Sequence, residues 1–109
     1  MREEAQTSRR SDMTVVRYDP CGKLEISGHA GMGRRGEDIV CAGISALCAG
    51  LVNFLAEDER FPSFSVEYGE GYLYCECSDP GSEDAFDLVL LGLRNIEAQY
   101  PEHLRIEEC

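Results

Sequence analysis

Residues 39–56, IVCAGISALCAGLVNFLA, form a long run without a charged side chain. The larger apolar residues of this run recur at helical spacing, at Val40, Ile44, Leu47, Leu51, Phe54 and Leu55. The run is long enough to be weighed as a membrane span, but acidic residues flank both ends. Small and polar residues also dilute its hydropathy, namely Gly43, Ser45, Gly50 and Asn53. We therefore expect a central helix of a soluble domain, which packs on a sheet and against a second apolar surface such as a partner subunit.

Two pairs of strands flank this helix in the sequence. Residues 13–18 (MTVVRY) and 23–28 (KLEISG) alternate apolar and polar side chains around the turn at 19–22, which predicts a hairpin. Residues 63–68 (SFSVEY) and 72–77 (YLYCEC) predict a second hairpin around Gly69-Glu70-Gly71.

A second amphipathic helix is predicted over residues 83–99, with an apolar stripe of Phe86, Val89, Leu90, Leu93 and Ile96. Pro101 ends this helix, and residues 103–107 (HLRIE) predict a short final strand. The order ββαββα, with one further β, indicates an α/β domain of the α+β type. We expect two layers, in which two helices pack on one face of a mixed or antiparallel sheet.

The length of 109 residues suits one domain. Residues 1–12 show no apolar period and are expected to form a flexible N-terminal tail, so residues 13–109 make up the single domain. The start of the chain has no apolar segment typical of a secretory signal. We therefore expect a cytoplasmic protein whose six cysteines are thiols rather than disulfides.

The charge of the chain limits its partners. Lys and Arg number 10 against 21 Asp and Glu, which gives a formal net charge of −11. A surface this acidic repels phosphate groups, so we expect neither direct nucleic-acid binding nor docking on an anionic membrane. It attracts basic partners instead, and ribosomal proteins are one such class.

One histidine and one cysteine have the spacing of a catalytic pair. His29 ends the second predicted strand, and Cys41 lies near the start of the central helix. If Asp38 is the N-cap, Cys41 is the third helical residue, where free backbone N–H groups stabilise a thiolate and accept an oxyanion. The histidine then takes the thiol proton and later returns it to the leaving amine. The alternative is a loop histidine and a buried core cysteine, and spacing alone does not decide between them.

Two other motifs are weaker. Gly31, Gly33 and Gly36 fit G-x-G-x-x-G, but this stretch follows a hairpin strand instead of opening a βαβ unit. Cys75 and Cys77 share one strand face with Leu73, which favours core packing over a metal site. We expect no metal and no cofactor.

The segment GHAG at 28–31, then Gly36, then DIVCAGISAL at 38–47, resembles the ribosomal-processing cysteine proteases, the Prp or YsxB-like family. The resemblance implies a cytosolic, homodimeric α/β cysteine endopeptidase without a cofactor. Its implied substrate is the N-terminal peptide of a basic protein, large-subunit ribosomal protein number twenty-seven, from which a short extension is removed.

The resemblance also implies roles for individual residues. His29 matches the family's base and Cys41 its nucleophile. Asp38 matches an acidic residue that either caps the helix or orients His29, and Ser45 matches a position one helical turn after the nucleophile. The glycines of the motif, Gly28, Gly31 and Gly36, are expected to shape the substrate loop and cleft.

A second hypothesis belongs to another functional class. The chain is then a non-catalytic dimeric module that binds a basic ribosomal protein or a ribosome assembly factor. Only the pair His29 and Cys41 separates the two hypotheses, because a binding module does not need it.

Overall fold

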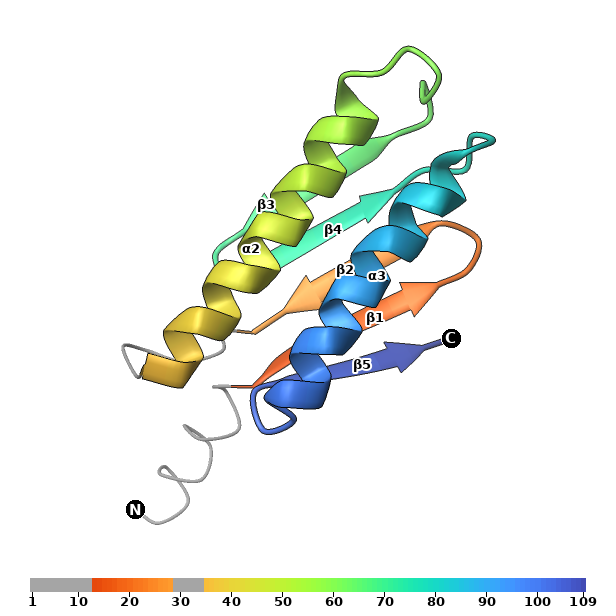
Figure 1. Cartoon of the computed structure of the whole chain (residues 1–109). Helices are drawn as coiled ribbons and strands as arrows, with labels where there is room; N and C mark the ends of the chain where they lie inside the picture. The colour runs from red at the N-terminus through yellow and green to blue at the C-terminus, as the bar shows by residue number, and fades with distance from the viewer. Residues whose placement is uncertain (1–12, 29–34) are drawn as a thin grey trace.

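The described part of the protein contains five strands and two helices in two layers (Figure 1). The computed structural model describes the backbone of residues 13–28 and 35–109, with side chains for 13–28 and 39–109. In chain order the elements are β1 (Thr14–Asp19), β2 (Lys23–Ser27), α2 (Arg35–Ala56), β3 (Ser65–Gly69), β4 (Tyr72–Glu76), α3 (Ser82–Gln99) and β5 (Leu104–Glu108). The expected order of elements is confirmed, including the final strand. The tail expected at residues 1–12 lies outside the described residues.

The strands form one mixed sheet in the order β3-β4-β2-β1-β5. The pairs β1–β2, β2–β4 and β3–β4 are antiparallel, whereas β5 returns after α3 to lie parallel to β1. The first and last strands of the domain are therefore neighbours, and β3 and β5 are the two edges. Both helices cover the same face of the sheet, with α2 over the β3–β4 side and α3 over the β1–β5 side (Figure 1). The expected fold class is confirmed.

The core lies between the helices and the sheet. Alternate strand residues point toward the helices and are buried, among them Val16, Leu24, Ile26, Leu73, Cys75 and Leu104. The stripe predicted on α3 supplies Phe86, Val89, Leu90 and Leu93, and α2 supplies Val40, Ile44, Leu51 and Leu55. Cys75 and Cys77 are 0% and 2% exposed, so the prediction that they pack in the core is confirmed.

Two glycines let α2 and α3 lie close together. A Cβ added at Gly92 of α3 would stand 2.8 Å from Cδ2 of Leu47, and one added at Gly43 of α2 would stand 3.0 Å from Cδ1 of Ile96. Small residues at such contacts bring the helix backbones together, so that both helices fit side by side on one sheet.

The start of α2 corrects the prediction made from the sequence. The helix begins at Arg35, so Asp38 lies inside it and is not its N-cap. Acidic residues are favourable both as caps and within a first helical turn, because both positions lie near the positive end of the helix dipole. The residues Glu37 and Asp38 are therefore compatible with either start of the helix.

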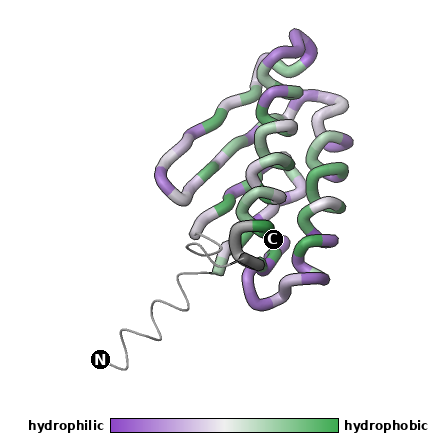
Figure 2. Tube along the Cα trace, turned by 60° about the vertical axis from the view of Figure 1, so that its left-hand side comes forward, coloured by the Kyte–Doolittle hydropathy of each residue, from purple (hydrophilic) through white to green (hydrophobic). Residues whose placement is uncertain are grey.

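One side of each helix remains apolar and uncovered. The stretch Ile39–Ala56 has a hydropathy of 2.2 and is long and apolar enough to cross a membrane by length and composition, a test that core helices of soluble proteins also pass. Here 33% of this stretch is buried within the chain. Apolar residues follow both helices in Figure 2, and the large ones left exposed are Ile39, Phe54, Leu88 and Leu91.

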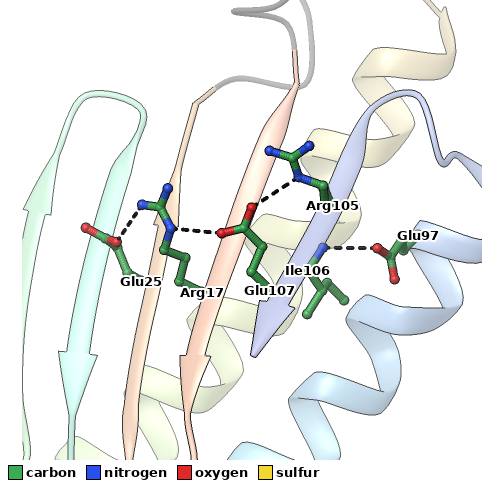
Figure 3. Close-up of polar contacts among 6 residues, drawn as sticks. All are labelled: Arg17, Glu25, Glu97, Arg105, Ile106 and Glu107. Atoms are coloured by element: carbon green, nitrogen blue, oxygen red, sulfur yellow. Dashed lines mark hydrogen bonds and ion pairs between the residues drawn. The ribbon is translucent and has the colours of Figure 1, made fainter. Parts of the chain in front are cut away.

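The opposite face of the sheet is polar. The Arg17 guanidinium bridges Glu25 at 3.3 Å and Glu107 at 3.1 Å, and Arg105 reaches Glu107 at 3.3 Å (Figure 3). These pairs are exposed to solvent, where each adds little to stability. The charged residues mark this face as a solvated one.

Candidate active site

Cys41 lies in the second turn of α2, because it is the seventh residue of a helix that begins at Arg35. In this position a helical N–H already bonds to the carbonyl four residues earlier. The effect of the helix dipole also fades beyond the first turn. The expectation that Cys41 lies in the first turn, beside free N–H groups and the positive end of the helix dipole, is therefore wrong.

A cleft of about 370 Å³ opens beside Cys41. Its helical wall consists of α2 residues on successive turns, namely Cys41, Ile44, Ser45 and Cys48. Its other wall comes from the sheet and includes Ile26, Leu73 and Tyr68. Among the residues that the structure describes, no charged side chain lines the cleft, although the chain carries a net charge of −11. These described walls are suited to an uncharged, largely apolar segment of a ligand.

Gly28 lines the cleft and has a backbone conformation that favours glycine. Its φ is +96°, and an added Cβ would lie 2.5 Å from the main-chain oxygen of Met13, so only glycine fits. Its N–H donates to the main-chain oxygen of Gly71 at 2.9 Å, which ties the end of β2 to the tip of the second hairpin. This contact fixes Gly28 on the wall of the cleft.

The structure brings three of the predicted site residues to one cleft: Gly28, Cys41 and Ser45. Gly36 lies in the first turn of α2, as does the backbone of Asp38, whose side chain is outside the described part of the protein. His29 and Gly31 lie outside the described residues.

Burial distinguishes Cys41 from the thiols of the core. Cys41 is partly exposed, whereas Cys48 and Cys75 are buried. Burial raises the pKa of Cys48 to about 12, and it does the same for Cys75. A thiol with so high a pKa stays protonated near neutral pH and is a poor nucleophile. Of these three cysteines, only Cys41 is accessible for chemistry in the cleft.

Sequence reasoning did not place the other lining residues of the cleft in the site, among them Thr14, Cys48 and Tyr68. Thr14 is 3% exposed and occupies an inward position of β1 otherwise filled by Val16 and Tyr18. A polar residue in an inward register was the available signal for Thr14. Cys48 and Tyr68 had no such signal, because only the packing of α2 over β3 and β4 brings them together.

Metal chemistry has no candidate site in the described part of the chain. Within residues 13–28 and 39–109, no group of three or more His, Cys, Asp or Glu side chains is placed to hold an ion. The nearest sequence candidate, Cys75 with Cys77, is core.

The comparisons with known proteins agree with one another. A model of the family described as cysteine protease Prp matches residues 13–105. The ribosomal processing cysteine protease Prp of Staphylococcus aureus is 32% identical over 100 residues, which span 87% of this chain and 93% of that protein. The Bacillus subtilis protein of the same name is 33% identical over 91 residues, spanning 76% of this chain and 81% of that protein.

Solved structures show the same fold. The S. aureus protease Prp, in complex with a covalently linked product peptide, superimposes with a TM-score of 0.79 at 26% identity, covering 89% of this chain and 100% of that one. A protein from Streptococcus mutans gives a TM-score of 0.72 at 29% identity, covering 91% and 96%.

The fold, the thiol in the cleft and these matches define the class of the protein, which is a cysteine peptidase. Within that class, the chain belongs to the cysteine protease Prp family.

Proposed function

We propose that this protein is a cysteine endopeptidase that removes the N-terminal extension of large-subunit ribosomal protein number twenty-seven, through Cys41 and His29. The observation that carries the proposal is the partly exposed thiol of Cys41 on the wall of a cleft. The relatives in S. aureus and B. subtilis are named ribosomal processing proteases. A net charge of −11 favours a basic substrate such as a ribosomal protein.

The proposed reaction has two stages. His29 takes the proton of the Cys41 thiol, and the sulfur attacks the carbonyl carbon of the scissile bond. The tetrahedral adduct collapses to a thioester as the C–N bond breaks, and His29 returns its proton to the leaving amine. Water then attacks the thioester with His29 as base, which releases the new carboxyl end and restores the thiol. The position of Gly28 on the wall of the cleft supports the assignment of His29, the next residue.

Supporting roles follow from the cleft and from the family motif. Ser45 lies one turn after Cys41 and also lines the cleft, so we assign its hydroxyl to a hydrogen bond with the substrate. Asp38 is assigned to the orientation of His29. Gly31 and Gly36 are assigned to the loop that borders the bound peptide.

We further propose that the protein acts as a homodimer in the cytoplasm. Phe54 and Leu88 are 48% and 69% exposed, and they line a groove of about 570 Å³ between α2 and α3. Apolar residues follow both helices (Figure 2), and Ala46, Leu51, Ala85 and Val89 also line this groove. Two strongly acidic chains associate most readily through a face with little charge, and contiguous exposed apolar surface is typical of such interfaces.

The test is cleavage of a peptide that copies the N-terminal extension and the residues after it, with products identified by mass spectrometry. The wild type should cut once, and Cys41→Ala and His29→Ala should not cut. The control is Cys21→Ser, which changes an exposed thiol in the β1–β2 turn, at the end of the strands away from Cys41. Cleavage by Cys41→Ala would disprove the nucleophile, and an intact peptide with the wild type would disprove the substrate.

A further inference from the structure

The two edges of the sheet differ in how their main-chain groups are satisfied. An edge strand presents a row of N–H and C=O groups that can pair with another extended chain. In this sheet the edges are β3 and β5. One of them is closed by the protein itself, and the other lies open beside the cleft.

The β5 edge is closed by α3 and by the turn that precedes the strand. The N–H of Ile106 donates to Oε2 of Glu97 at 3.0 Å, a contact drawn in Figure 3. The N–H of Leu104 donates to the main-chain oxygen of Tyr100 at 3.3 Å. A polypeptide that approaches β5 finds these two donors already occupied, and three charged residues in the strand further disfavour pairing.

No described residue closes the β3 edge in this way. Gly69 and Tyr72 flank a two-residue turn and therefore form a hydrogen-bonded pair of the β3–β4 hairpin. Because hydrogen-bonded and non-hydrogen-bonded pairs alternate, the N–H and C=O groups of Val66 and Tyr68 point outward from the sheet. Within the part of the chain that the structure describes, nothing bonds to these outward groups.

The side chains of β3 also leave its edge accessible. The strand, Ser65–Gly69, contains one charged residue, Glu67, and neither proline nor lysine. Those residues, together with bulges, are the usual means by which proteins protect an edge strand from pairing. Val66 is instead β-branched and suited to an extended neighbour.

The open edge leads to the candidate active site. Tyr68 lines the same cleft as Cys41, and its side chain is 69% exposed. The tip of the hairpin is tied to Gly28 through the main-chain oxygen of Gly71. A chain that runs along β3 therefore passes beside Tyr68, which lines the cleft.

We propose that the substrate polypeptide adds to the sheet as a strand beside β3, with main-chain hydrogen bonds to Val66 and Tyr68. This proposal rests on the peptidase function proposed above and extends it to the mode of substrate binding. Main-chain pairing holds an extended peptide regardless of its sequence, while every second side chain points toward the cleft. Selectivity for the substrate's side chains then comes from the cleft, and pairing with β3 aligns the scissile bond with Cys41.

The first test uses the wild-type protein and substrate peptides that carry a single N-methyl group at successive positions. N-methylation removes one N–H donor without a change of side chain. For residues next to β3, KM should rise about fivefold at alternate positions, the effect of one lost hydrogen bond, and change little at the positions between. A uniform effect along the peptide, or none, would overturn the proposal.

The second test changes the protein. Val66→Pro removes the outward N–H of Val66, at an edge position where proline is tolerated because that N–H is not part of the sheet. It should raise KM for the unmodified peptide about fivefold while kcat stays close to wild type. The matched control, Val66→Ala, shortens the same side chain and keeps the N–H, so it should retain the wild-type KM. Circular dichroism of both variants verifies that the sheet is intact.

These outcomes separate the two proposals. Suppose that the wild type cuts the unmodified peptide, that Val66→Pro leaves KM unchanged and that the N-methyl series shows no alternation in KM. The peptidase function then stands, and pairing on β3 is wrong. If the wild type does not cut the peptide, the peptidase proposal itself fails. If Val66→Pro lowers the mass of the protein in solution and leaves KM unchanged, the edge binds a second copy and the proposal is overturned.

Discussion

The carboxylate of Asp79 accepts two hydrogen bonds from Ser63, one from its main-chain N–H at 2.8 Å and one from its hydroxyl at 2.7 Å. Ser63 precedes β3 and Asp79 follows β4, so this pair ties two loops together at the end of the sheet away from Cys41. The Ser63 hydroxyl also accepts the main-chain N–H of Ser78 at 3.0 Å. The contact fixes the far end of the hairpin whose near end borders the cleft.

The contact between Ser63 and Asp79 makes the stability of the protein depend on pH in the acid range. The hydrogen bonds from Ser63 lower the pKa of Asp79 below its ordinary value. The pKa of Asp79 in the folded protein is therefore below its value in the unfolded chain, which is near 3.9. The contribution of Asp79 to the free energy of unfolding is complete above that pH, and it is lost as the pH falls through the folded pKa. In Asp79→Asn, the free energy of unfolding should therefore fall less steeply below about pH 4.

Urea unfolding at several pH values measures this effect. Ser63→Ala should reproduce part of it, and Ser65→Ala, a change at an exposed serine of β3, should behave as the wild type. An unchanged pH dependence in Asp79→Asn would contradict the prediction.

The thiols should react at very different rates with an alkylating reagent. Cys48 and Cys75, each with a pKa of about 12, hold about a thousandfold less thiolate near pH 7 than an ordinary thiol. Cys41 should therefore be modified far faster than either. Peptide mapping by mass spectrometry after short exposures gives the rates, and equally slow modification of all three would argue against Cys41 as the nucleophile.

Gly28→Ala should destabilise the protein and reduce cleavage. The alanine would have to adopt a φ of +96° with its Cβ 2.5 Å from the Met13 oxygen. Backbone strain of this kind costs about 1–3 kcal/mol. The matched control is Gly50→Ala, where an added Cβ meets nothing within 4 Å. Because alanine is favoured over glycine inside a helix, Gly50→Ala should raise the free energy of unfolding by about 0.5–1 kcal/mol. Thermal unfolding measures the stability of both variants. Equal stability of Gly28→Ala and Gly50→Ala would contradict the geometry assigned to Gly28.

The proposed dimer should depend on the exposed apolar side of the helices. Leu88→Glu places a charge in the groove between α2 and α3 and should convert the dimer to a monomer. Gln99→Glu adds the same charge at an exposed position on the same helix and should leave the dimer intact. Sedimentation velocity distinguishes the two species, and a dimer that survives Leu88→Glu must use another surface.

Much of the secondary structure was predictable because its signals are local. Apolar residues at every second position identified the strands, and the three-to-four-residue spacing of Phe86, Val89, Leu90 and Leu93 identified α3. The start of α2 was not predictable, since Glu37 and Asp38 are favourable both before and within a first turn. The error displaced Cys41 from the first turn to the second and removed the helix N-terminus as its source of activation.

The sequence by itself determined the order of elements, the inward faces and the family motif that singles out Cys41 and His29. These depend on the residues within one element or one short segment. Only the tertiary structure decided that β5 pairs with β1, that β3 is left as the open edge, and that Thr14, Cys48 and Tyr68 share a cleft with Cys41. The physical reason is that strand pairing and helix packing join residues far apart in the chain, and their choice depends on the whole core rather than on any local pattern.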